Sequence, residues 1–218
     1  MVQIHKKDEP QVLIVYKQSE NPSFEDFSGK NIVRNQLVEE QYGLCAYCMS
    51  RITNKIDFNG AFKHVHCKIE HFKPKSKYPE EQLNYKNMLG CCNGNEGTPL
   101  KCQTCDTHKG NSELLFSPAE EDDYCRMDIK FYSDGTIHSG NEKFDQQLKN
   151  ILNLNASHLV EKRKAIMDGI LEAIQKVENI NNKFINNQIN NFSAITNGNR
   201  EEFYYVAVYY LKKFLVNT

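Results

Sequence analysis

CAYC (45–48) places two cysteines three positions apart, and CQTC (102–105) repeats this spacing later in the chain. Two thiolates at this spacing can bind one tetrahedral Zn²⁺ from a tight turn, and two such turns complete a closed site. A segment rich in Gly, Lys and Asn buries too little apolar surface to fix its own fold, and zinc ligation supplies folding free energy directly. The two motifs therefore predict a structural zinc site that organises the chain between them.

The identity of the zinc ligands is only partly decided by this pattern. The chain has eight cysteines, and in a cytosolic protein these are metal ligands or buried thiols more often than disulfides. The predicted ligands are four of the following five: Cys45, Cys48, Cys92, Cys102 and Cys105. The fourth ligand is either Cys92 or Cys102. Cys91 and Cys92 are adjacent in sequence, and adjacent cysteines rarely bind the same ion. Cys67 and Cys125 are expected to be packed thiols.

The bulk composition predicts a cytoplasmic chain with no overall attraction for nucleic acid. The 218 residues are 39% apolar and carry a formal net charge of −1. The longest apolar runs fall far short of a membrane span, and the N-terminal stretch lacks signal-peptide architecture. Because no global basic field exists, any site for a polyanion must be local.

The expected fold class is α+β, with a zinc-stapled core flanked by helices, a short β hairpin and a helical C-terminal region. Apolar spacing and turn residues predict these elements: a strand over 12–18, a helix over 31–43, irregular or short-stranded chain over 52–80, a hairpin over 128–139, helix from Asn155 onward, a poor helix or loop over 179–191 and a docked helix over 201–216. The corresponding domains are an N-terminal strand and helix scaffold (1–44), a core with the zinc knuckles (45–115), a hairpin extension (116–150) and a helical region that could dock a partner (151–218).

KIEHFKPKSKY (68–78) places an acid and a histidine side by side within a run of lysines. On a strand, Glu70 and His71 point to opposite faces, so they can act on one phosphate only if the backbone bends, and a turn before Pro74 could provide that bend. The alternative interpretation is a surface acid beside a surface histidine, with the lysines forming a solvated face.

The order of the pieces resembles the HNH, or ββα-metal, nuclease motif. CAYC, EHFKPK (70–75), Asn87, a cysteine and CDTHKGN (105–111) follow one another over 45–111, about a third of the chain. The resemblance implies a ββα-metal core with these roles: Glu70 as first ligand of a Mg²⁺ or Mn²⁺ ion, His71 as the general base for water, Asn87 as the brace of the loop carrying that histidine, and His108 as the second ligand. A neutral histidine near pH 7 can take the proton of an attacking water.

Lysines near this motif are expected to bind the substrate. The candidates for contact with flanking phosphates are Lys73, Lys75, Lys77 and Lys109. The chain departs from the commonest family pattern in having Glu70 where Asp is usual, and in the insertion CNGNEGTPLKC (92–102). In the simple pattern a cysteine lies five residues after the asparagine, which favours Cys92 over Cys102.

A narrower resemblance covers about 35–165. The stretches GLCAYCMSRI (43–52), IEHFKPKSKYPEEQLNYKNML (69–89), CDTHKGNSELLFSP (105–118) and LNLNASHLVEKR (152–163) resemble the HNH component of Septu-type anti-phage systems, and some retron defence systems carry a similar component. That resemblance implies a dimer-forming ATPase partner of the ABC/SMC-like kind (PtuA-like) that controls a PtuB-like nuclease.

Three functions stay open at this point. The favoured one is a metal-dependent endonuclease that cuts DNA within a defence complex. The second is cleavage of RNA such as tRNA, since in-line attack on a phosphodiester is common to both substrates. The third is a non-catalytic, zinc-stapled binding or adaptor module, in which His71 and His108 could be replaced at little functional cost.

Overall fold

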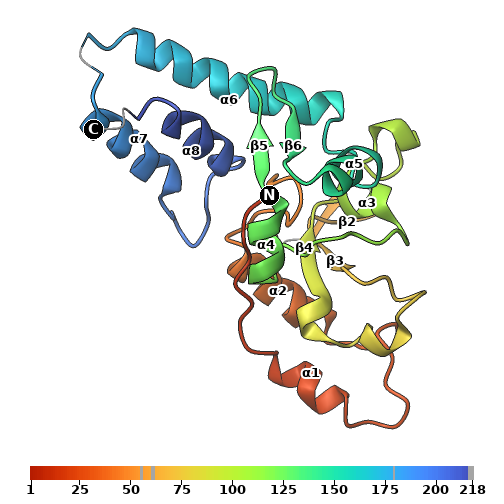
Figure 1. The fold of residues 1–218 in the computed structure, drawn as a ribbon. Helices are drawn as coiled ribbons and strands as arrows, with labels where there is room; N and C mark the ends of the chain where they lie inside the picture. The colour runs from red at the N-terminus through yellow and green to blue at the C-terminus, as the bar shows by residue number, and fades with distance from the viewer. Residues whose placement is uncertain (55, 60–61, 179, 216–218) are drawn as a thin grey trace.

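The computed structural model describes residues 1–54, 56–59, 62–178 and 180–215. Figure 1 shows an elongated molecule, with helix α1 at one end, helices α6, α7 and α8 at the other, and the small sheets between them. The α-helices are α1 (Gln11–Tyr16), α2 (Lys30–Glu40), α3 (Cys105–Lys109), α4 (Glu121–Met127), α5 (Glu142–Asn150), α6 (Ser157–Gln175), α7 (Asn182–Ser193) and α8 (Tyr204–Lys212), and the 3-10 helices are η1 (Pro79–Glu81), η2 (Tyr85–Asn87) and η3 (Leu100–Cys102).

The strands of the described residues form two-stranded antiparallel sheets. The pairs are β1 (Ile56–Asn59) with β2 (Phe62–Val65), β3 (Lys68–His71) with β4 (Met88–Cys91), and β5 (Ile129–Phe131) with β6 (Ile137–Ser139). The register of β3 on β4 runs from Lys68 opposite Cys91 to His71 opposite Met88. After β4 the chain passes through η3 to α3. The combination of helices and small antiparallel sheets confirms the predicted α+β class.

The strand predicted over 12–18 is wrong, because this stretch forms helix α1. The Pro10 carbonyl accepts hydrogen bonds from the backbone N–H groups of Leu13 and Ile14, at 2.9 and 3.2 Å. Periodicity alone cannot assign a short apolar run to a strand or a helix. Where no neighbouring strand is available for pairing, a helix satisfies the backbone hydrogen bonds within the segment itself. Only Leu13 of this helix is buried, and Val15 is 56% exposed.

Several predicted elements are confirmed. Helix α2 fills the helix expected over 31–43, β5 and β6 form the hairpin of 128–139, and α6 and α8 form the C-terminal helices. The Asn-rich segment is a helix, α7, because Asn181 caps it by accepting a hydrogen bond from the Phe184 N–H at 2.9 Å, and Ile185 is buried. Val216, at the end of the predicted tail helix, lies outside the described residues.

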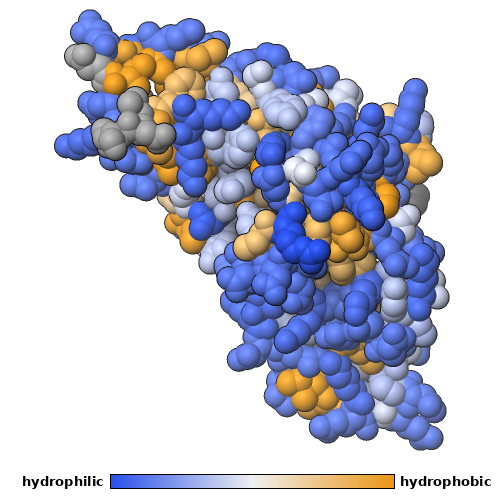
Figure 2. All heavy atoms as spheres, in the orientation of Figure 1, coloured by the Kyte–Doolittle hydropathy of each residue, from blue (hydrophilic) through white to orange (hydrophobic). Residues whose placement is uncertain are grey.

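The apolar C-terminal tail packs against other helices of the same chain. Val206, Ala207 and Leu211 of α8 are buried, and the last two pack with Ile170 and Ile174 of α6. Figure 2 shows apolar side chains at the end of the molecule that carries the C-terminal helices, and a second apolar area at the end that carries α1. The tail therefore packs as a helix against the rest of the chain, as the sequence predicts.

The largest apolar cluster surrounds the cysteines of the predicted zinc site. Cys67 is buried as expected, whereas Cys125 is exposed on α4, which corrects its prediction as a packed thiol. Within the described part of the chain, no helix combines the length and apolar character needed to cross a bilayer.

Candidate active site and metal centre

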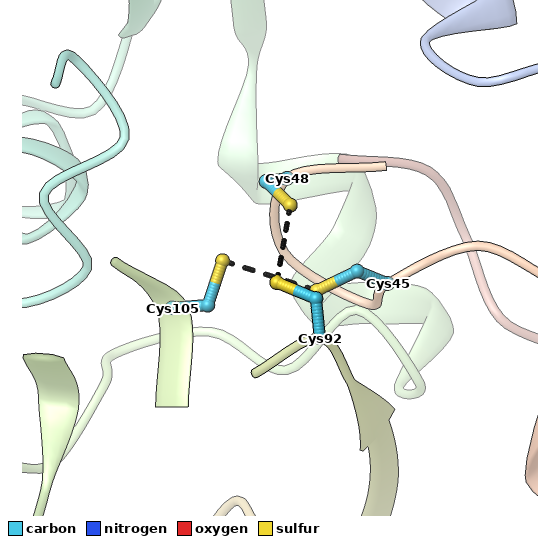
Figure 3. Close-up of side chains that lie close together, drawn as sticks. All are labelled: Cys45, Cys48, Cys92 and Cys105. Atoms are coloured by element: carbon cyan, nitrogen blue, oxygen red, sulfur yellow. Dashed lines mark hydrogen bonds between the residues drawn. The ribbon is translucent and has the colours of Figure 1, made fainter. Parts of the chain in front are cut away.

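Four cysteine sulfurs converge in the core (Figure 3). They belong to Cys45, Cys48, Cys92 and Cys105, and all four sulfur atoms lie within 4.8 Å of one another. The Sγ atoms of Cys45 and Cys105 are 3.9 Å apart, and those of Cys48 and Cys92 are 3.7 Å apart. Zinc–sulfur bonds of about 2.3 Å in a tetrahedron place the sulfurs about 3.8 Å from one another. The cluster therefore has the size and donor set of a structural zinc site.

Of the two cysteines between which the sequence left the fourth place open, Cys92 lies in the cluster and Cys102 does not. Strand β4 ends at Cys91, whose side chain is buried, and the next residue, Cys92, reaches the cluster. Cys102 ends η3 instead, where its carbonyl accepts a hydrogen bond from the Asn95 side chain at 3.1 Å. The motif CQTC thus contributes one cluster cysteine rather than two.

The loop carrying Cys45 and Cys48 is fixed by backbone hydrogen bonds. The Cys45 N–H donates to the Ser50 carbonyl at 2.9 Å, and the Met49 N–H donates to the Cys45 carbonyl at 3.1 Å. The Ala46 N–H donates to the Gly90 carbonyl at 3.0 Å, which joins this loop to β4. The two halves of the zinc site are therefore aligned by the same strand that pairs with β3.

A buried arginine provides positive charge near the cluster. Arg163 of α6 is 1% exposed and donates to the carbonyls of Gly135 and Leu154, at 2.6 and 2.7 Å. Burial lowers its pKa to about 10, and the charges of Cys48 and Cys105 act against that shift. A tetrathiolate zinc site carries net negative charge, which this guanidinium partly offsets.

A cleft of about 340 Å³ opens beside the cluster, between β3, the loop that follows it and α3. Its lining includes Glu70 and His71 from the end of β3, Lys75 from the loop, and Asp106 from the first turn of α3. The chain bends at Phe72 and Lys73, directly after β3, and both Glu70 and His71 border the cleft. Asp106, which follows Cys105 directly, was not predicted.

Glu70 is held by two donors. Its side chain is 4% exposed, and its Oε1 atom accepts hydrogen bonds from the Tyr47 hydroxyl at 3.0 Å and the Lys109 Nζ at 2.7 Å. Burial raises the pKa of Glu70 well above its usual value, the neighbouring Asp106 carboxyl raises it further, and Lys109 opposes the shift. A carboxyl in this setting favours a nearby cation.

His71 has a defined tautomer. Its Nε2 atom lies 2.8 Å from the Gln82 carbonyl oxygen, which can only accept, so Nε2 carries the proton and Nδ1 is the basic nitrogen. Burial lowers the pKa of His71 to about 4, although the Gln82 carbonyl and Asp106 oppose this shift. The Phe24 ring packs against the imidazole at a centroid distance of 4.5 Å. The imidazole is therefore neutral at pH 7.

Asn87 ties together the two ends of the loop after β3. Its Oδ1 accepts from the Lys73 N–H at 2.7 Å, and its Nδ2 donates to the carbonyls of Lys73 and Glu81, at 3.0 and 3.2 Å. Glu81 precedes Gln82, whose carbonyl holds the His71 ring. Asn87 therefore connects the start of this loop to the segment whose carbonyl holds the His71 ring.

Replacing Asn87 with alanine should destabilise the fold. Asn87→Ala leaves up to three backbone polar groups at Lys73 and Glu81 without this partner, which costs on the order of 2–3 kcal/mol in the free energy of unfolding. Urea unfolding followed by circular dichroism measures it. The matched control is Asn150→Ala, because Asn150 is exposed and its side chain donates to Gln146. Equal losses below about 0.5 kcal/mol in both variants would contradict the bracing geometry.

The predicted substrate lysines fall into two groups. Lys73, Lys75 and Lys77 are on the surface, and each pairs with an acid: Glu81 at 2.8 Å, Glu25, and Glu113 at 2.8 Å respectively. The structure differs from the prediction at Lys109, whose side chain is 0% exposed and bound to Glu70 and to the His71 carbonyl. Lys109 compensates a buried carboxylate and is not presented to a phosphate.

His108 does not join Glu70 and His71 in the cleft. Its Nδ1 lies 2.8 Å from the Ile151 carbonyl, and the cleft lining contains Asp106 instead. Successive residues of an α-helix are rotated by about 100°, so Asp106 and His108 lie about 200° apart around the axis. Because Cys105 starts the helix at the zinc site, this rotation was the signal in the sequence that could have favoured Asp106 over His108.

No family model matches this chain, and comparison with curated proteins finds a distant relative. The chain is 29% identical, over 96 residues, to the protein named Septu protein PtuB from Bacillus thuringiensis. The alignment covers 40% of this chain and 34% of that protein, so the chain spans about a third of the length of the relative it matches. The chain is thus a distant homologue of a protein named Septu protein PtuB.

Proposed function

We propose that this chain is a metal-dependent endonuclease of the HNH, ββα-metal type that hydrolyses phosphodiester bonds of nucleic acid. The observation that carries the proposal is the meeting of Glu70, His71 and Asp106 around one cleft, beside a cysteine cluster with zinc geometry. Strands β3 and β4 followed by α3 supply the strand–strand–helix order of such a core. DNA is the favoured substrate, and RNA is the alternative.

His71 acts as the general base in this proposal. Its unprotonated Nδ1 accepts a proton from the water that attacks phosphorus, while Nε2 keeps its hydrogen bond to the Gln82 carbonyl. The imidazolium formed in this step is stabilised by that carbonyl and by Asp106, the two neighbours that already favour the charged form. Asn87 keeps the loop that bears Gln82 in register with His71.

Glu70 and Asp106 are the proposed ligands of the divalent ion, with Asp106 taking the place that the sequence pattern suggested for His108. Both carboxyl groups lie close enough to raise the pKa of Glu70, and oxygen ligands of this kind suit Mg²⁺ and Mn²⁺. When bound, the ion would offset the negative charge that grows on the phosphate during in-line attack.

The defence context is part of the proposal. The homology to Septu protein PtuB supports a role as the effector of a Septu-type system, and the resemblance noted above implies an ABC/SMC-like ATPase partner. The aligned part is a minor fraction of the relative, and the cleft supports the nuclease chemistry of this role rather than its defence context.

A cleavage assay tests the proposal directly. Zinc-loaded protein, alone and with its candidate ATPase partner, is incubated with closed circular DNA and with structured RNA, in Mg²⁺, in Mn²⁺ and in EDTA. We expect nicking of DNA that depends on the divalent ion. Cleavage of RNA alone would select the alternative substrate, and no cleavage under any of these conditions would favour the non-catalytic adaptor.

The ion pairs of the surface lysines give a prediction about substrate affinity. Lys75 lines the cleft and pairs with Glu25, so nucleic acid must compete with this carboxylate. Exposed pairs contribute at most about 1 kcal/mol, and we therefore expect Glu25→Gln to tighten DNA binding by up to about fivefold at low salt. Fluorescence anisotropy in a His71→Ala background measures this without cleavage.

Glu39→Gln is the matched control for this prediction. Glu39 pairs with Lys7 at 3.3 Å on the surface of α2, away from the cleft lining, and its replacement removes the same charge. Equal affinity changes in the two variants would show that net charge, rather than release of Lys75, sets the effect.

A further inference from the structure

Tyr47 lies inside the zinc knuckle and reaches the proposed catalytic carboxylate. It stands between Cys45 and Cys48, is 0% exposed, and donates its hydroxyl to Glu70 Oε1 at 3.0 Å. The two residues are far apart in sequence and are both buried. The contact therefore links the cysteine cluster to the cleft by one hydrogen bond.

The same Glu70 oxygen carries the contact with Lys109. Nζ of Lys109 lies 2.7 Å from Oε1, so two donors converge on one oxygen of this carboxyl group. Because Tyr47 and Lys109 both hold Oε1, these two contacts also set the direction of the second carboxylate oxygen, Oε2. Orientation of a ligand by a hydrogen bond from a neighbouring group is a recurring feature of metal sites.

The second proposed ligand is also tied to the cysteine cluster. Asp106 follows Cys105 directly, and the Cys105 N–H donates to the Leu152 carbonyl at 2.9 Å, which fixes the start of α3. Both carboxyl groups of the cleft thus depend on the knuckle residues for their positions, Glu70 through a side-chain contact and Asp106 through the chain itself.

We infer that Tyr47 is a positioning residue that orients the Glu70 carboxylate for a divalent cation, and so couples the zinc knuckle to the ion site of the cleft. The inference rests on the proposed function, because it concerns the ion bound by Glu70 and Asp106. It also gives a role to the tyrosine in CAYC, which zinc ligation alone does not require.

The test is binding of Mn²⁺ to zinc-loaded full-length protein. Tyr47→Phe removes one oxygen and keeps the buried ring, so zinc content should stay at about one per chain and the fold should persist. Mn²⁺ affinity, measured by electron paramagnetic resonance titration, should weaken about tenfold, as loss of a group that orients a metal ligand commonly does. Asp106→Asn locates the ion, because it should abolish the same binding.

Tyr85→Phe is the matched control. Tyr85 is 2% exposed and donates its hydroxyl to another buried carboxylate, Glu40, at 2.8 Å. Both substitutions remove a buried tyrosine–glutamate hydrogen bond, and only one of these bonds reaches the cleft. We expect Tyr85→Phe to leave Mn²⁺ affinity unchanged.

The outcomes separate the inference from the proposed function. Equal Mn²⁺ affinity in Tyr47→Phe and wild type, an equal loss in Tyr85→Phe, or loss of zinc in Tyr47→Phe would each overturn the positioning role. Wild-type protein that binds no Mn²⁺ sensitive to Asp106→Asn would overturn the ion site itself, and with it both proposals. Weakening confined to Tyr47→Phe supports the coupling.

Discussion

His71→Ala should abolish nucleic-acid cleavage while leaving the fold and the zinc content intact. The side chain supplies the only unprotonated imidazole nitrogen among the residues that line the cleft, so its loss removes the acceptor for the proton of the attacking water. General-base catalysis typically contributes about 10²–10⁴ in rate, and the initial rate of plasmid nicking should fall by that factor. Measurement on DNA and on RNA also tests the substrate.

His138→Ala is the control for this experiment. His138 is half-buried on β6, where its Nδ1 lies 3.2 Å from Asp145, and it does not border the cleft. Its loss should leave the cleavage rate within about twofold of wild type, as for a residue that makes no contact with the reaction. If His71→Ala cleaves nucleic acid as fast as this control, His71 is not the general base. That result would favour the non-catalytic adaptor function.

Loss of Cys92 should unfold the core, whereas loss of Cys102 should be tolerated. Serine has nearly the shape of cysteine, but its hydroxyl does not give up its proton to zinc, so Cys92→Ser leaves an incomplete site. Structural zinc contributes about 10 kcal/mol or more to the folding of small metal sites, which is comparable to the whole stability of a domain. We therefore expect Cys92→Ser to lack zinc and a cooperative thermal transition.

Cys102→Ser is the matched comparison, because Cys102 belongs to the C-x2-C motif but not to the cluster. It should retain about one zinc per chain, as a complete four-ligand site does. Elemental analysis and thermal unfolding of the purified variants measure both effects. Zinc loss in Cys102→Ser with zinc retained in Cys92→Ser would reverse the ligand assignment.

The zinc site could be predicted from the sequence because its chemistry is local. The C-x2-C spacing places Cys45 and Cys48 on one turn, and such a pair commonly supplies two ligands of a closed zinc site. The choice of Cys92 over Cys102 depended on the end of β4, since the insertion between them gives either cysteine enough chain to reach the cluster. Pairing of β4 with β3 decided it.

The cleft could be predicted only in part, because a motif does not fix the direction of each side chain. Glu70 and His71 both border the cleft, at the end of β3, where the chain bends at Phe72 and Lys73. Lys109 was predicted as a phosphate contact from its charge alone, yet burial of Glu70 requires a cation in the core, and Lys109 fills that place. The strand predicted over 12–18 was wrong for another reason. An apolar run of this length is compatible with a strand or a helix, and the contacts available in the folded chain decide between them.

Anomalous diffraction from crystals of the zinc-loaded protein soaked in Mn²⁺ is the most direct test of how these residues are organised. Data at the two metal absorption edges should show zinc among Cys45, Cys48, Cys92 and Cys105, and manganese between the Glu70 and Asp106 carboxyl groups beside His71 Nδ1. Zinc at any other set of cysteines, or manganese absent from the cleft while the crystal holds it elsewhere, would contradict a thiolate clamp that shapes a carboxylate–imidazole nuclease site.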